Sequence, residues 1–317
     1  MGEIMAFGHD TTTDEVLDGV DLTGRTAFVT GASGGLGAET ARALAARGAA
    51  VTIAARDLAK AEGVAASIHE STGSTVDVVQ LELMDLDSVR ACAQGWLATH
   101  GPLNLLINNA GIMACPLDRT DAGWEIQFAT NHLGHFLLTG LLLPALKEGA
   151  PARIVNLSSG AHRFGNIDFD DLHFENREYN KFAAYGQSKT ANVLFARELG
   201  RRLEGTGVTA NAVHPGIIQT ELGRHLTPED LAAFPGDTPP EEMRFKTVES
   251  GAATSVWAAT SAELDGRSGL YLEDCQIGLP EDEVEGMGGY APWIMDDDAA
   301  HTLWGVSEEL VGTRIDV

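Results

Sequence analysis

The sequence predicts an α/β domain built on a doubly wound parallel sheet. Short apolar segments of strand length alternate with helical runs along most of the chain, and this alternation is typical of strand-helix-strand units with parallel strands. The strand candidates are almost continuously apolar, as expected where helices cover both faces of a sheet. A glycine-rich loop follows the first strand candidate and leads directly into a helical run. In this position between a strand and a helix, such a loop indicates a binding site more strongly than an ordinary turn.

The expected elements follow one another in a regular order, without an internal repeat. We expect strands at 26–30, 51–55, 76–83, 105–107, 153–157, 208–213 and 269–272. We expect helices at 38–47, 58–69, 88–100, 118–130 and 132–147, in the run that begins near 185, and at 248–261. No composition change marks a second domain, so we expect one domain at 23–317 after an acidic lead-in at 1–22. Residues 276–317 form a C-terminal extension of that domain.

Charge excludes several classes of partner. The chain has 317 residues, of which 21 are lysine or arginine and 46 are aspartate or glutamate, so its formal net charge is -25. Nucleic acid and anionic membrane surfaces attract basic faces, so we expect neither as a partner. A solvated acidic surface explains the charge more simply than a specific basic partner does.

Cysteine usage and hydropathy favour a soluble protein of the cytoplasm. Cys92, Cys115 and Cys275 are scattered, without the paired spacing of a zinc site, and are too few to cross-link a secreted chain of this length. The N-terminus lacks the basic and then apolar order of a signal peptide. The longest apolar stretch, 136–146, is far shorter than the roughly 20 residues that cross a bilayer.

Three glycines follow the first strand candidate in the pattern Gly-x-x-x-Gly-x-Gly. Gly31 permits a tight turn, Gly35 leaves room for close approach of the backbone, and Gly37 lets the helix pack against the strand. Backbone N–H groups at the start of that helix then face a pyrophosphate. An ordinary turn is the alternative, but the position between a strand and a helix favours a dinucleotide site.

The residue that reads the ribose should lie about 20 positions further on, at the end of the second strand. The chain has Arg56 there and no carboxylate. An acid would repel a 2′-phosphate, whereas an arginine can pair with it through two hydrogen bonds. NADP is therefore favoured over NAD. The alternative is that Arg56 only pairs with Asp57 or another surface acid.

A tyrosine and a lysine, Tyr185 and Lys189, lie four residues apart at the start of a helical run. This spacing places both side chains on one face of a helix. A nearby ammonium favours the phenolate, so we expect Lys189 to lower the pKa of Tyr185 toward neutrality and make it a proton donor or acceptor. The alternative is a surface lysine beside a half-buried tyrosine.

Seven short motifs follow one another between residues 24 and 275. They are Thr30 to Gly37, Asp85-Leu86, Asn108 to Gly111, Asn131, Ser158-Ser159, Tyr185 to Lys189, and Pro215 to Thr220. Together and in this order they resemble the motifs of the short-chain dehydrogenases/reductases of the single-domain type. The segments 130–136, 153–159 and 191–195 resemble the retinol-dehydrogenase-like branch. The resemblance implies a Rossmann fold, a bound dinucleotide and an oxidoreductase.

The resemblance also implies a catalytic tetrad. Tyr185 is its general acid/base, and Lys189 holds the nicotinamide ribose and favours the phenolate. Asn131 positions a water that continues a proton relay through Lys189, and Ser159 rather than Ser158 hydrogen-bonds the substrate oxygen. The separation of Ser159 from Tyr185 is long for the family, so 165–182 is expected to be a surface flap near the substrate.

The same resemblance assigns cofactor contacts. Asn109, Ala110 and Gly111 line the adenosine side, and Asp85 and Leu86 hold the adenine. Pro215, Gly216, Ile218 and Thr220 contact the nicotinamide carboxamide. The full set of expected cofactor-binding residues is Gly31, Ser33, Gly35, Leu36, Gly37, Arg56, Asp85, Leu86, Asn109, Ala110, Gly111, Tyr185, Lys189, Pro215, Gly216, Ile218 and Thr220. No metal is expected, because His162, His173 and His214 lack a ligand spacing and are taken as surface or loop histidines.

The segment 217–245 is the expected lid over the substrate, because it follows the nicotinamide-side motif and is rich in loop formers. Its apolar residues suggest an uncharged, hydrophobic alcohol or carbonyl compound, unless they pack only against the lid itself. They are Leu222, Leu226, Leu231, Phe234, Met243 and Phe245, and the possible anion contacts are Arg224 and Arg244. The segment 278–293 is expected to close the pocket or a subunit contact.

Three functions remain open at this stage. The leading one is an NADP-dependent carbonyl reductase or alcohol dehydrogenase. The second is reduction of a carbon-carbon double bond on the same scaffold, and the third is a non-enzymatic NADP-binding sensor. The complete set of catalytic residues favours the first. By resemblance, a homodimer or homotetramer pairs through helices at 118–147 and 182–203.

Overall fold

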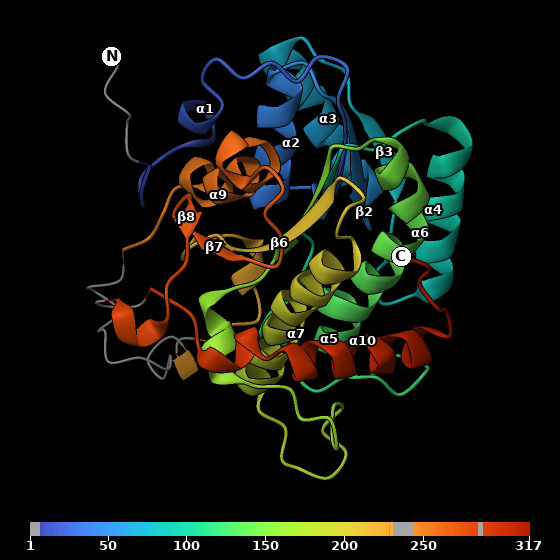
Figure 1. Ribbon diagram of the computed structural model, residues 1–317, viewed down its shortest axis with the longest axis vertical. Helices are drawn as coiled ribbons and strands as arrows, with labels where there is room; N and C mark the ends of the chain where they lie inside the picture. The colour runs from blue at the N-terminus through green and yellow to red at the C-terminus, as the bar shows by residue number, and fades with distance from the viewer. Residues whose placement is uncertain (1–6, 228, 231–243, 285–287) are drawn as a thin grey trace.

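A sheet of eight strands runs through the centre of the described part of the molecule (Figure 1). The structure is a computed structural model that describes residues 7–227, 229–230, 244–284 and 288–317. The strands are β1 (Thr26–Thr30), β2 (Ala50–Ala55), β3 (Asp77–Gln80), β4 (Leu105–Asn108), β5 (Ala152–Leu157), β6 (Val208–His214), β7 (Tyr271–Glu273) and β8 (Gln276–Ile277). They lie in the order β3-β2-β1-β4-β5-β6-β7-β8. All neighbours are parallel except β7 and β8.

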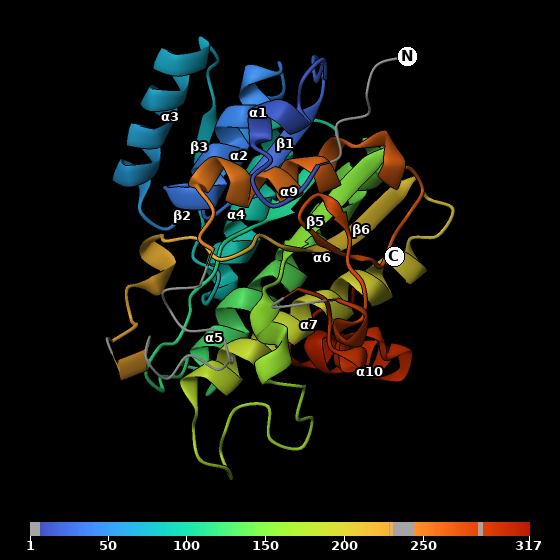
Figure 2. The same ribbon diagram turned by 90° about the vertical axis from the view of Figure 1, so that its left-hand side faces the viewer.

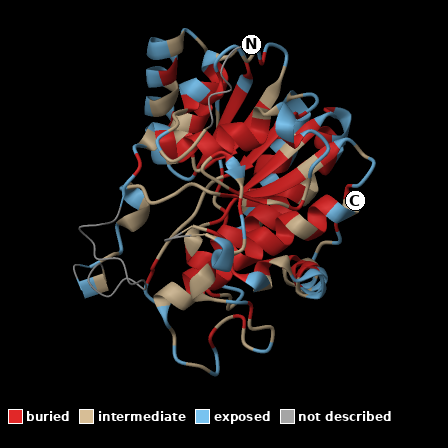
Figure 3. Ribbon diagram, turned by 60° about the vertical axis from the view of Figure 1, so that its left-hand side comes forward, coloured by how far each residue is buried: buried red, intermediate tan, exposed pale blue. Residues whose placement is uncertain are grey.

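Helices cover both faces of this sheet (Figure 2). One face carries α2 (Gly35–Ala46), α3 (Leu58–Thr72) and α9 (Val248–Thr260), and the other carries α4 (Leu86–Thr99), α6 (Gly134–Glu148) and α7 (Lys181–Arg202). Alternate residues of β1 enter the two cores: Phe28 belongs to the α4–α6–α7 side, while Ala27 and Val29 belong to the other. Figure 3 shows the central strands as buried, whereas the edge strands β3 and β8 are partly exposed. The predicted doubly wound parallel sheet is confirmed.

The strand order reverses between β1 and β4, which are neighbours although two strands separate them in the chain. Ligands of open parallel sheets bind outside the carboxyl ends of the strands at such a switch point. Buried amides mark this edge: Asn108 at the end of β4 donates through Nδ2 to Asn156 Oδ1 at 2.7 Å and to Thr139 Oγ1 at 2.9 Å. The site is therefore expected where β1, β4 and β5 end.

The expected pair of helices at 118–130 and 132–147 is wrong in detail. The chain forms a short helix α5 (Ile126–Phe128), a π-helical turn (Ala129–Leu133) and then α6, without an interruption. Glu125 is buried and caps the start of this run, since its Oε2 accepts from the N–H of Phe128 at 2.7 Å. The helix therefore begins at 126, and residues upstream form a turn closed by a bridge between Arg119 and Glu125.

Two helices outside the repeating units were not expected from the sequence. Within the lead-in, residues 1–6 lie outside the described residues, and α1 (Thr13–Val16) packs against α9 with Leu17 fully buried. At the other end, α10 (Asp297–Val311) packs against α7 (Figure 1). Its signals are the cap residues: Asp296 accepts from the N–H of Ala299, and Gly312 adopts a φ of 62°.

The flap at 165–182 contains no strand, and its only helical residues are the first two of α7. Asp171 organises it by accepting from the backbone N–H groups of Glu175, Asn176 and Arg177. Gln187 of α7 donates to the carbonyl of Leu172 at 2.8 Å. Among the helices that the structure describes, none combines the length and apolar character needed to cross a bilayer.

Candidate active site

The glycine turn after β1 is shaped by close backbone approach. Gly31 has a φ of 66°, and a Cβ there would lie 2.6 Å from Ala110 Cα. A Cβ on Gly37 would lie 2.5 Å from Asn109 Nδ2 and 2.6 Å from the carbonyl oxygen of Gly31. Gly35 has a φ of 55°, which L side chains rarely adopt. Each of these positions therefore favours glycine, but for partly different reasons from those expected: Gly35 because of its positive φ, and Gly31 and Gly37 because of close approach.

The same turn leaves the start of α2 open to an anion. Gly34 caps the helix without a side-chain hydrogen bond, and the first turn of α2 contains no acidic residue. A Cβ on Gly34 would meet nothing within 4 Å. Backbone N–H groups at a helix start that no side chain caps form a site for phosphate groups. The residues present therefore fit the pyrophosphate of a dinucleotide.

Asn109 braces this turn from the end of β4. Its Nδ2 donates to the carbonyl of Thr30 at 2.7 Å and to that of Gly31 at 3.3 Å. The Thr30 hydroxyl accepts from the N–H groups of Asn109 and Ala110 at 2.9 and 3.0 Å. Asn109 thus lies beside the expected cofactor position, with its amide nitrogen committed to the glycine turn.

The nicotinamide-side loop reaches the same region from β6. A Cβ on Gly35 would lie 3.6 Å from Thr220 Cγ2. A Cβ on Gly251 of α9 would lie 2.6 Å from Ile218 Cγ1 and 2.8 Å from Leu36 Cδ2. The expected contacts Leu36, Ile218 and Thr220, which come from two distant parts of the sequence, are therefore brought together.

The expected adenosine-side residues follow β2 and β3. Arg56 comes directly after β2, its side chain is 65% exposed, and its Nε lies 3.7 Å from Glu82 Oε2. Asp57 instead caps α3 by accepting from the N–H of Lys60. Asp85 caps α4, and Leu86 is the first residue of that helix. An acid does face Arg56, but the long contact and high exposure leave its guanidinium accessible.

Lys189 is buried next to the loop that follows β4. Its Nζ donates to the carbonyl of Leu157 at 3.0 Å. A Cβ on Gly111 would lie 3.5 Å from this Nζ and 3.2 Å from Asn131 Oδ1. Asn131 and Lys189 therefore lie close together, as the resemblance implied, and Gly111, which was expected on the adenosine side, lies beside both. Burial lowers the pKa of Lys189 to about 8.

Asn131 lies in the π-helical turn, and π-turns are common at functional sites. Its side chain is held on both sides: Oδ1 accepts from the N–H of Ile112, and Nδ2 donates to the Ile112 carbonyl and to Ser188 Oγ, each at 2.9 Å. Its own carbonyl accepts from His135 Nδ1 at 3.0 Å. In this arrangement Asn131 joins the loop after β4 to α7.

Ser159 and Tyr185 converge, as the resemblance required. Ser159 follows β5 by two residues, and its Oγ accepts from the N–H of Ala161 at 3.1 Å. The Ser159 side chain also lies close enough to the phenol of Tyr185 to lower the pKa of Tyr185. Ser158 instead donates to the carbonyl of Lys189 at 2.9 Å and is buried. Ser159, not Ser158, is therefore available to a substrate oxygen beside the phenol.

The expected lowering of the pKa of Tyr185 is wrong for this structure. Burial raises the pKa of Tyr185 to about 12, although the hydrogen bond from Ser159 acts in the other direction. Lys189 Nζ lies 5.6 Å from the centre of the Tyr185 ring and donates to a carbonyl instead of the phenol. Desolvation of the phenolate therefore dominates over the positive charge.

Sequence reasoning missed three polar residues around the site. The interpretation as surface or loop histidines is wrong for His162, which is fully buried in the 3₁₀ helix Gly160–Phe164. His214 is half-buried and ends β6, whereas His173 is half-buried and does lie in a turn. Lys246 is buried, with its Nζ 2.5 Å from Asp274 Oδ1 and its stem against Gly216. The available signal was position: His162 follows Ser159 by three residues, and His214 precedes Pro215. The described residues contain no cluster suited to a metal ion.

The expected lid is described only in part, since 228 and 231–243, including Leu231, Phe234 and Met243, lie outside the described residues. Arg244 pairs with Asp10 at 2.7 Å, and Arg224 donates to the carbonyl of Glu221. Phe245 is 46% exposed.

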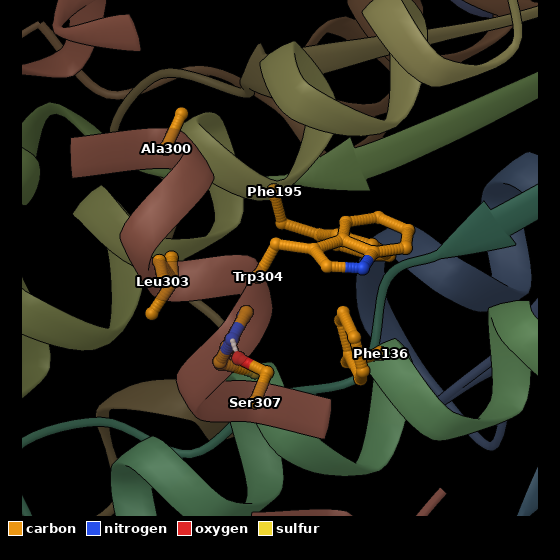
Figure 4. A pocket seen from close by; sticks show the side chains of 7 residues that line it. Phe136, Phe195, Ala300, Leu303, Trp304 and Ser307 are labelled. Carbon is orange, nitrogen blue, oxygen red and sulfur yellow. Dashed lines mark hydrogen bonds between the residues drawn. The ribbon is translucent and has the colours of Figure 1, made fainter. Parts of the chain in front are cut away.

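A small hollow lies away from this site, between α10 and the helices α6 and α7 (Figure 4). The rings of Phe136, Phe195 and Trp304 meet there, with centroids 5.0 to 6.0 Å apart. His132 shares a hydrogen bond of 2.8 Å with Ser307. The hollow has no room for a water molecule, so it is a packing seam that attaches the C-terminal extension.

Comparison with known families agrees with this geometry. Residues 25–231 match the family model described as short chain dehydrogenase. Human retinol dehydrogenase 12 is 46% identical over 301 residues, which cover 93% of this chain and 89% of that protein. Mouse retinol dehydrogenase 14 is 44% identical over 300 residues, with coverage of 91% and 86%.

Solved structures with a similar fold include the following two. A protein from Mycobacterium paratuberculosis, described as uncharacterised, has a TM-score of 0.73 and 37% identity, with coverage of 94% of this chain and 97% of that one. A candidate NAD(P)-dependent gluconate 5-dehydrogenase from Beutenbergia cavernae has a TM-score of 0.65 and 28% identity, with coverage of 80% and 96%. The latter structure holds NADP at low occupancy.

Proposed function

We propose, on the premise that this chain belongs to the short-chain dehydrogenase family and to its retinol-dehydrogenase-like branch, that it interconverts an alcohol and a carbonyl compound with NADP. Membership makes the chain an oxidoreductase acting on alcohol or carbonyl groups. The choice of NADP, the role of Tyr185 and the class of substrate are the proposal. The observation that carries it is the convergence of Ser159 and Tyr185 beside Lys189.

Tyr185 is the proposed proton donor. Its raised pKa keeps the phenol protonated at neutral pH, which is the form that reduction of a carbonyl requires. Ser159 donates to the same substrate oxygen and stabilises the negative charge that develops on it. When bound, NADPH supplies the hydride for this reduction.

Lys189 and Asn131 support this pair from the side of the loop after β4. Lys189 is proposed to contact the nicotinamide ribose; its buried position next to the loop after β4, where a Cβ on Gly111 would lie 3.5 Å from its Nζ, supports this role. Asn131 fixes the same loop through Ile112 and fixes α7 through Ser188. We propose that its role as holder of a relay water is secondary to this bracing.

The preference for NADP depends on Arg56. Its exposed guanidinium follows β2 at the position where dinucleotide-binding sheets read the ribose, and it can pair with a 2′-phosphate. The NADP held by the Beutenbergia cavernae structure supports the same choice. NAD is the less favoured cofactor.

The substrate is proposed to be an uncharged, hydrophobic alcohol or aldehyde. The names of the similar retinol dehydrogenases point to an apolar alcohol for those proteins. The exposed side chains of Leu117, Phe245 and Leu279 offer apolar surface on this chain.

The test is oxidation of NADPH, followed by absorbance, with a panel of apolar aldehydes, ketones and enones. Consumption with aldehydes or ketones supports the proposal. Consumption with enones alone would favour a carbon-carbon double-bond reductase, and binding of NADPH without any turnover would favour a sensor. Replacing NADPH by NADH in the same assay tests the cofactor choice.

Assembly and location remain proposals as well. A homodimer or homotetramer through 118–147 and 182–203 must use the part of α7 that α10 leaves uncovered, because α10 packs on that helix. Light scattering on the full chain measures this state. Location in the cytoplasm agrees with three buried free cysteines among the described residues, and fractionation of the source cells tests it.

A further inference from the structure

Two imidazoles hold one peptide bond, the bond that joins Ser159 to Gly160. His162 Nδ1 lies 2.7 Å from the carbonyl oxygen of Ser159. On the other side of the same peptide, the N–H of Gly160 donates to His214 Nδ1 at 3.0 Å. Both polar groups of the peptide that follows the catalytic serine are therefore taken by histidines from two different segments.

The partners define the protonation of each ring. His162 faces a carbonyl with Nδ1 and receives the N–H of Ala291 at Nε2, at 3.1 Å, so it is neutral with its proton on Nδ1. His214 receives an N–H at Nδ1, so it is neutral with its proton on Nε2. The N–H of Gly216, in the nicotinamide-side loop, also faces His214 Nδ1 at 3.4 Å.

We propose that His162 and His214 are positioning residues for Ser159. They fix the plane of the Ser159–Gly160 peptide and thereby aim the serine hydroxyl at the substrate oxygen. Through His162 the C-terminal segment at 288–293 becomes a support of the catalytic turn, and through His214 the turn is joined to the nicotinamide-side loop.

The need for such a support follows from the residue type at 160. A glycine makes rotation of the preceding peptide easy, and only hydrogen bonds can then select one orientation. A Cβ on Gly160 would lie 3.3 Å from His214 Nε2, so the absence of a side chain also lets the imidazole approach. The bonds of the two rings, together with the backbone N–H of His162, which donates to the Ser159 carbonyl at 3.1 Å, remove the flexibility that admits His214.

Desolvation keeps both rings neutral, although His214 is only half-buried. His162 is fully buried and lies edge-on to Tyr271, with ring centroids 5.1 Å apart. Burial lowers the pKa of His162 to about 4 and that of His214 to about 3. The positive groups that face them act in the same direction: they are Arg163 for both rings and Lys246 for His214, while Asp274 opposes the shift at His214.

The C-terminal segment is attached at several points around His162. Trp293 Nε1 donates to the His162 carbonyl at 3.3 Å, and Arg163 Nη1 donates to the carbonyl of Gly288 at 2.9 Å. Glu273 Oε1 accepts from the N–H of Gly289 at 2.7 Å. Loss of the bond between His162 and Ala291 alone therefore leaves the C-terminal segment 288–293 docked. Substitutions at 162 can then test the bond to Ser159 and the bond to Ala291 one at a time.

Two substitutions at 162 separate those bonds. His162→Asn keeps an amide nitrogen at the position of Nδ1 and can still donate to Ser159, but it cannot reach Ala291. His162→Gln places its amide at the position of Nε2 and can still accept from Ala291, but it cannot reach Ser159. We expect kcat to fall about 10- to 100-fold in His162→Gln and by less than about 3-fold in His162→Asn, with KM for NADPH unchanged in both.

A matched pair at 214 tests the other half. His214→Asn can present its amide oxygen to the N–H of Gly160, whereas His214→Leu fills the space without an acceptor. We expect His214→Leu to lose about 10- to 100-fold in kcat and His214→Asn to retain most of it. Equal kcat within either pair, or a loss seen only in KM for NADPH, would overturn the proposal.

Amide hydrogen exchange provides a readout that needs no turnover. The N–H of Gly160 should exchange slowly in the full-length wild-type chain and in His214→Asn, and faster in His214→Leu. Equal exchange in all three would overturn the inference. The inference rests on the proposed catalytic role of Ser159, and the two fail differently: if no carbonyl compound consumes NADPH the proposed function fails, while the exchange rates still decide whether His214 holds the peptide.

Discussion

The ammonium of Lys189 lies 5.6 Å from the centre of the Tyr185 ring and does not hydrogen-bond the phenol. The two residues share one face of α7, as their spacing requires. Both are buried, so each loses the solvation that favours its charged form. The result is a pair in which the pKa of the phenol is raised and the pKa of the ammonium is lowered.

Replacing the proposed proton donor should stop the reaction without disturbing cofactor binding. Tyr185→Phe removes only the hydroxyl, so we expect a fall in kcat of at least about 100-fold and an unchanged Kd for NADPH. Turnover is measured by NADPH absorbance and binding by NADPH fluorescence. A Tyr185→Phe protein with near wild-type kcat would show that another group supplies the proton.

The rate of reduction should fall as pH rises through about 8. Burial lowers the pKa of Lys189 to about 8, so its positive charge is present below that pH and is lost above it. Tyr185 stays protonated over the same range because its pKa is raised to about 12. A pH profile of kcat measures this fall in rate. A profile that is flat to pH 10 would mean that the charge on Lys189 does not assist the reaction.

Reversing the charge at Arg56 should shift the cofactor preference toward NAD. Arg56→Asp replaces a partner of the 2′-phosphate by a group that repels it, and we expect the ratio of kcat/KM for NADPH and NADH to fall about 10- to 100-fold. Glu82→Gln is the matched opposite variant, because it removes the acid that faces Arg56. Glu82→Gln should strengthen NADPH binding. An unchanged ratio of kcat/KM for NADPH and NADH in Arg56→Asp would show that Arg56 does not bind the 2′-phosphate.

A charged cluster around Glu198, with two partners on α7 and one on α10, should make stability depend on acid pH. Glu198 of α7 is buried and accepts from Arg201, Arg202 and His301. These bonds outweigh burial and lower its pKa to about 2. The stabilisation is therefore present above the ordinary glutamate pKa of about 4.5 and is lost as pH falls toward 2.

Glu198→Gln should lower the free energy of unfolding at pH 7 by about 1 kcal/mol, because solvent screens the exposed partners Arg201 and His301, and flatten its pH dependence below 4.5. Urea unfolding at several pH values measures both effects. The exposed Glu204 provides the control, since Glu204→Gln should change neither. Equal effects of the two substitutions would mean that the pH dependence comes from the net charge of the protein and not from the bonds between Glu198 and its three partners.

Most of the fold was predictable because it depends on local patterns. Apolar segments of strand length, such as 51–55 and 105–107, lie in β2 and β4, and the run at 248–261 matches α9 within one residue. The helix α10 was missed although Asp296 and Gly312 are typical cap residues. The π-helical turn at Asn131 has no signal in residue periodicity, because tertiary contacts with Ile112 and Ser188 hold it.

The candidate site was predictable to a smaller degree. The spacing of Gly31, Gly35 and Gly37 predicted a turn whose close contacts the structure explains. The predicted direction of the pKa shift at Tyr185 was wrong. The spacing of Tyr185 and Lys189 indicated that the two side chains are close, but it gave no information about the burial that raises the pKa of the phenol. The positioning role proposed for His162 and His214 could not be predicted, because the sequence does not show which backbone groups their rings contact.

Local patterns in the chain are enough to predict the doubly wound sheet, the glycine turn and the shared face of Tyr185 and Lys189. These depend on backbone preferences and side-chain direction over a few residues. Three other features follow only from the packed fold: Tyr185 keeps its proton, Asn131 braces a loop, and His162 joins Ser159 to Ala291, 129 residues further along the chain. They could not be predicted because solvation and hydrogen-bond partners are set by segments that meet only when the sheet and both helical layers have packed.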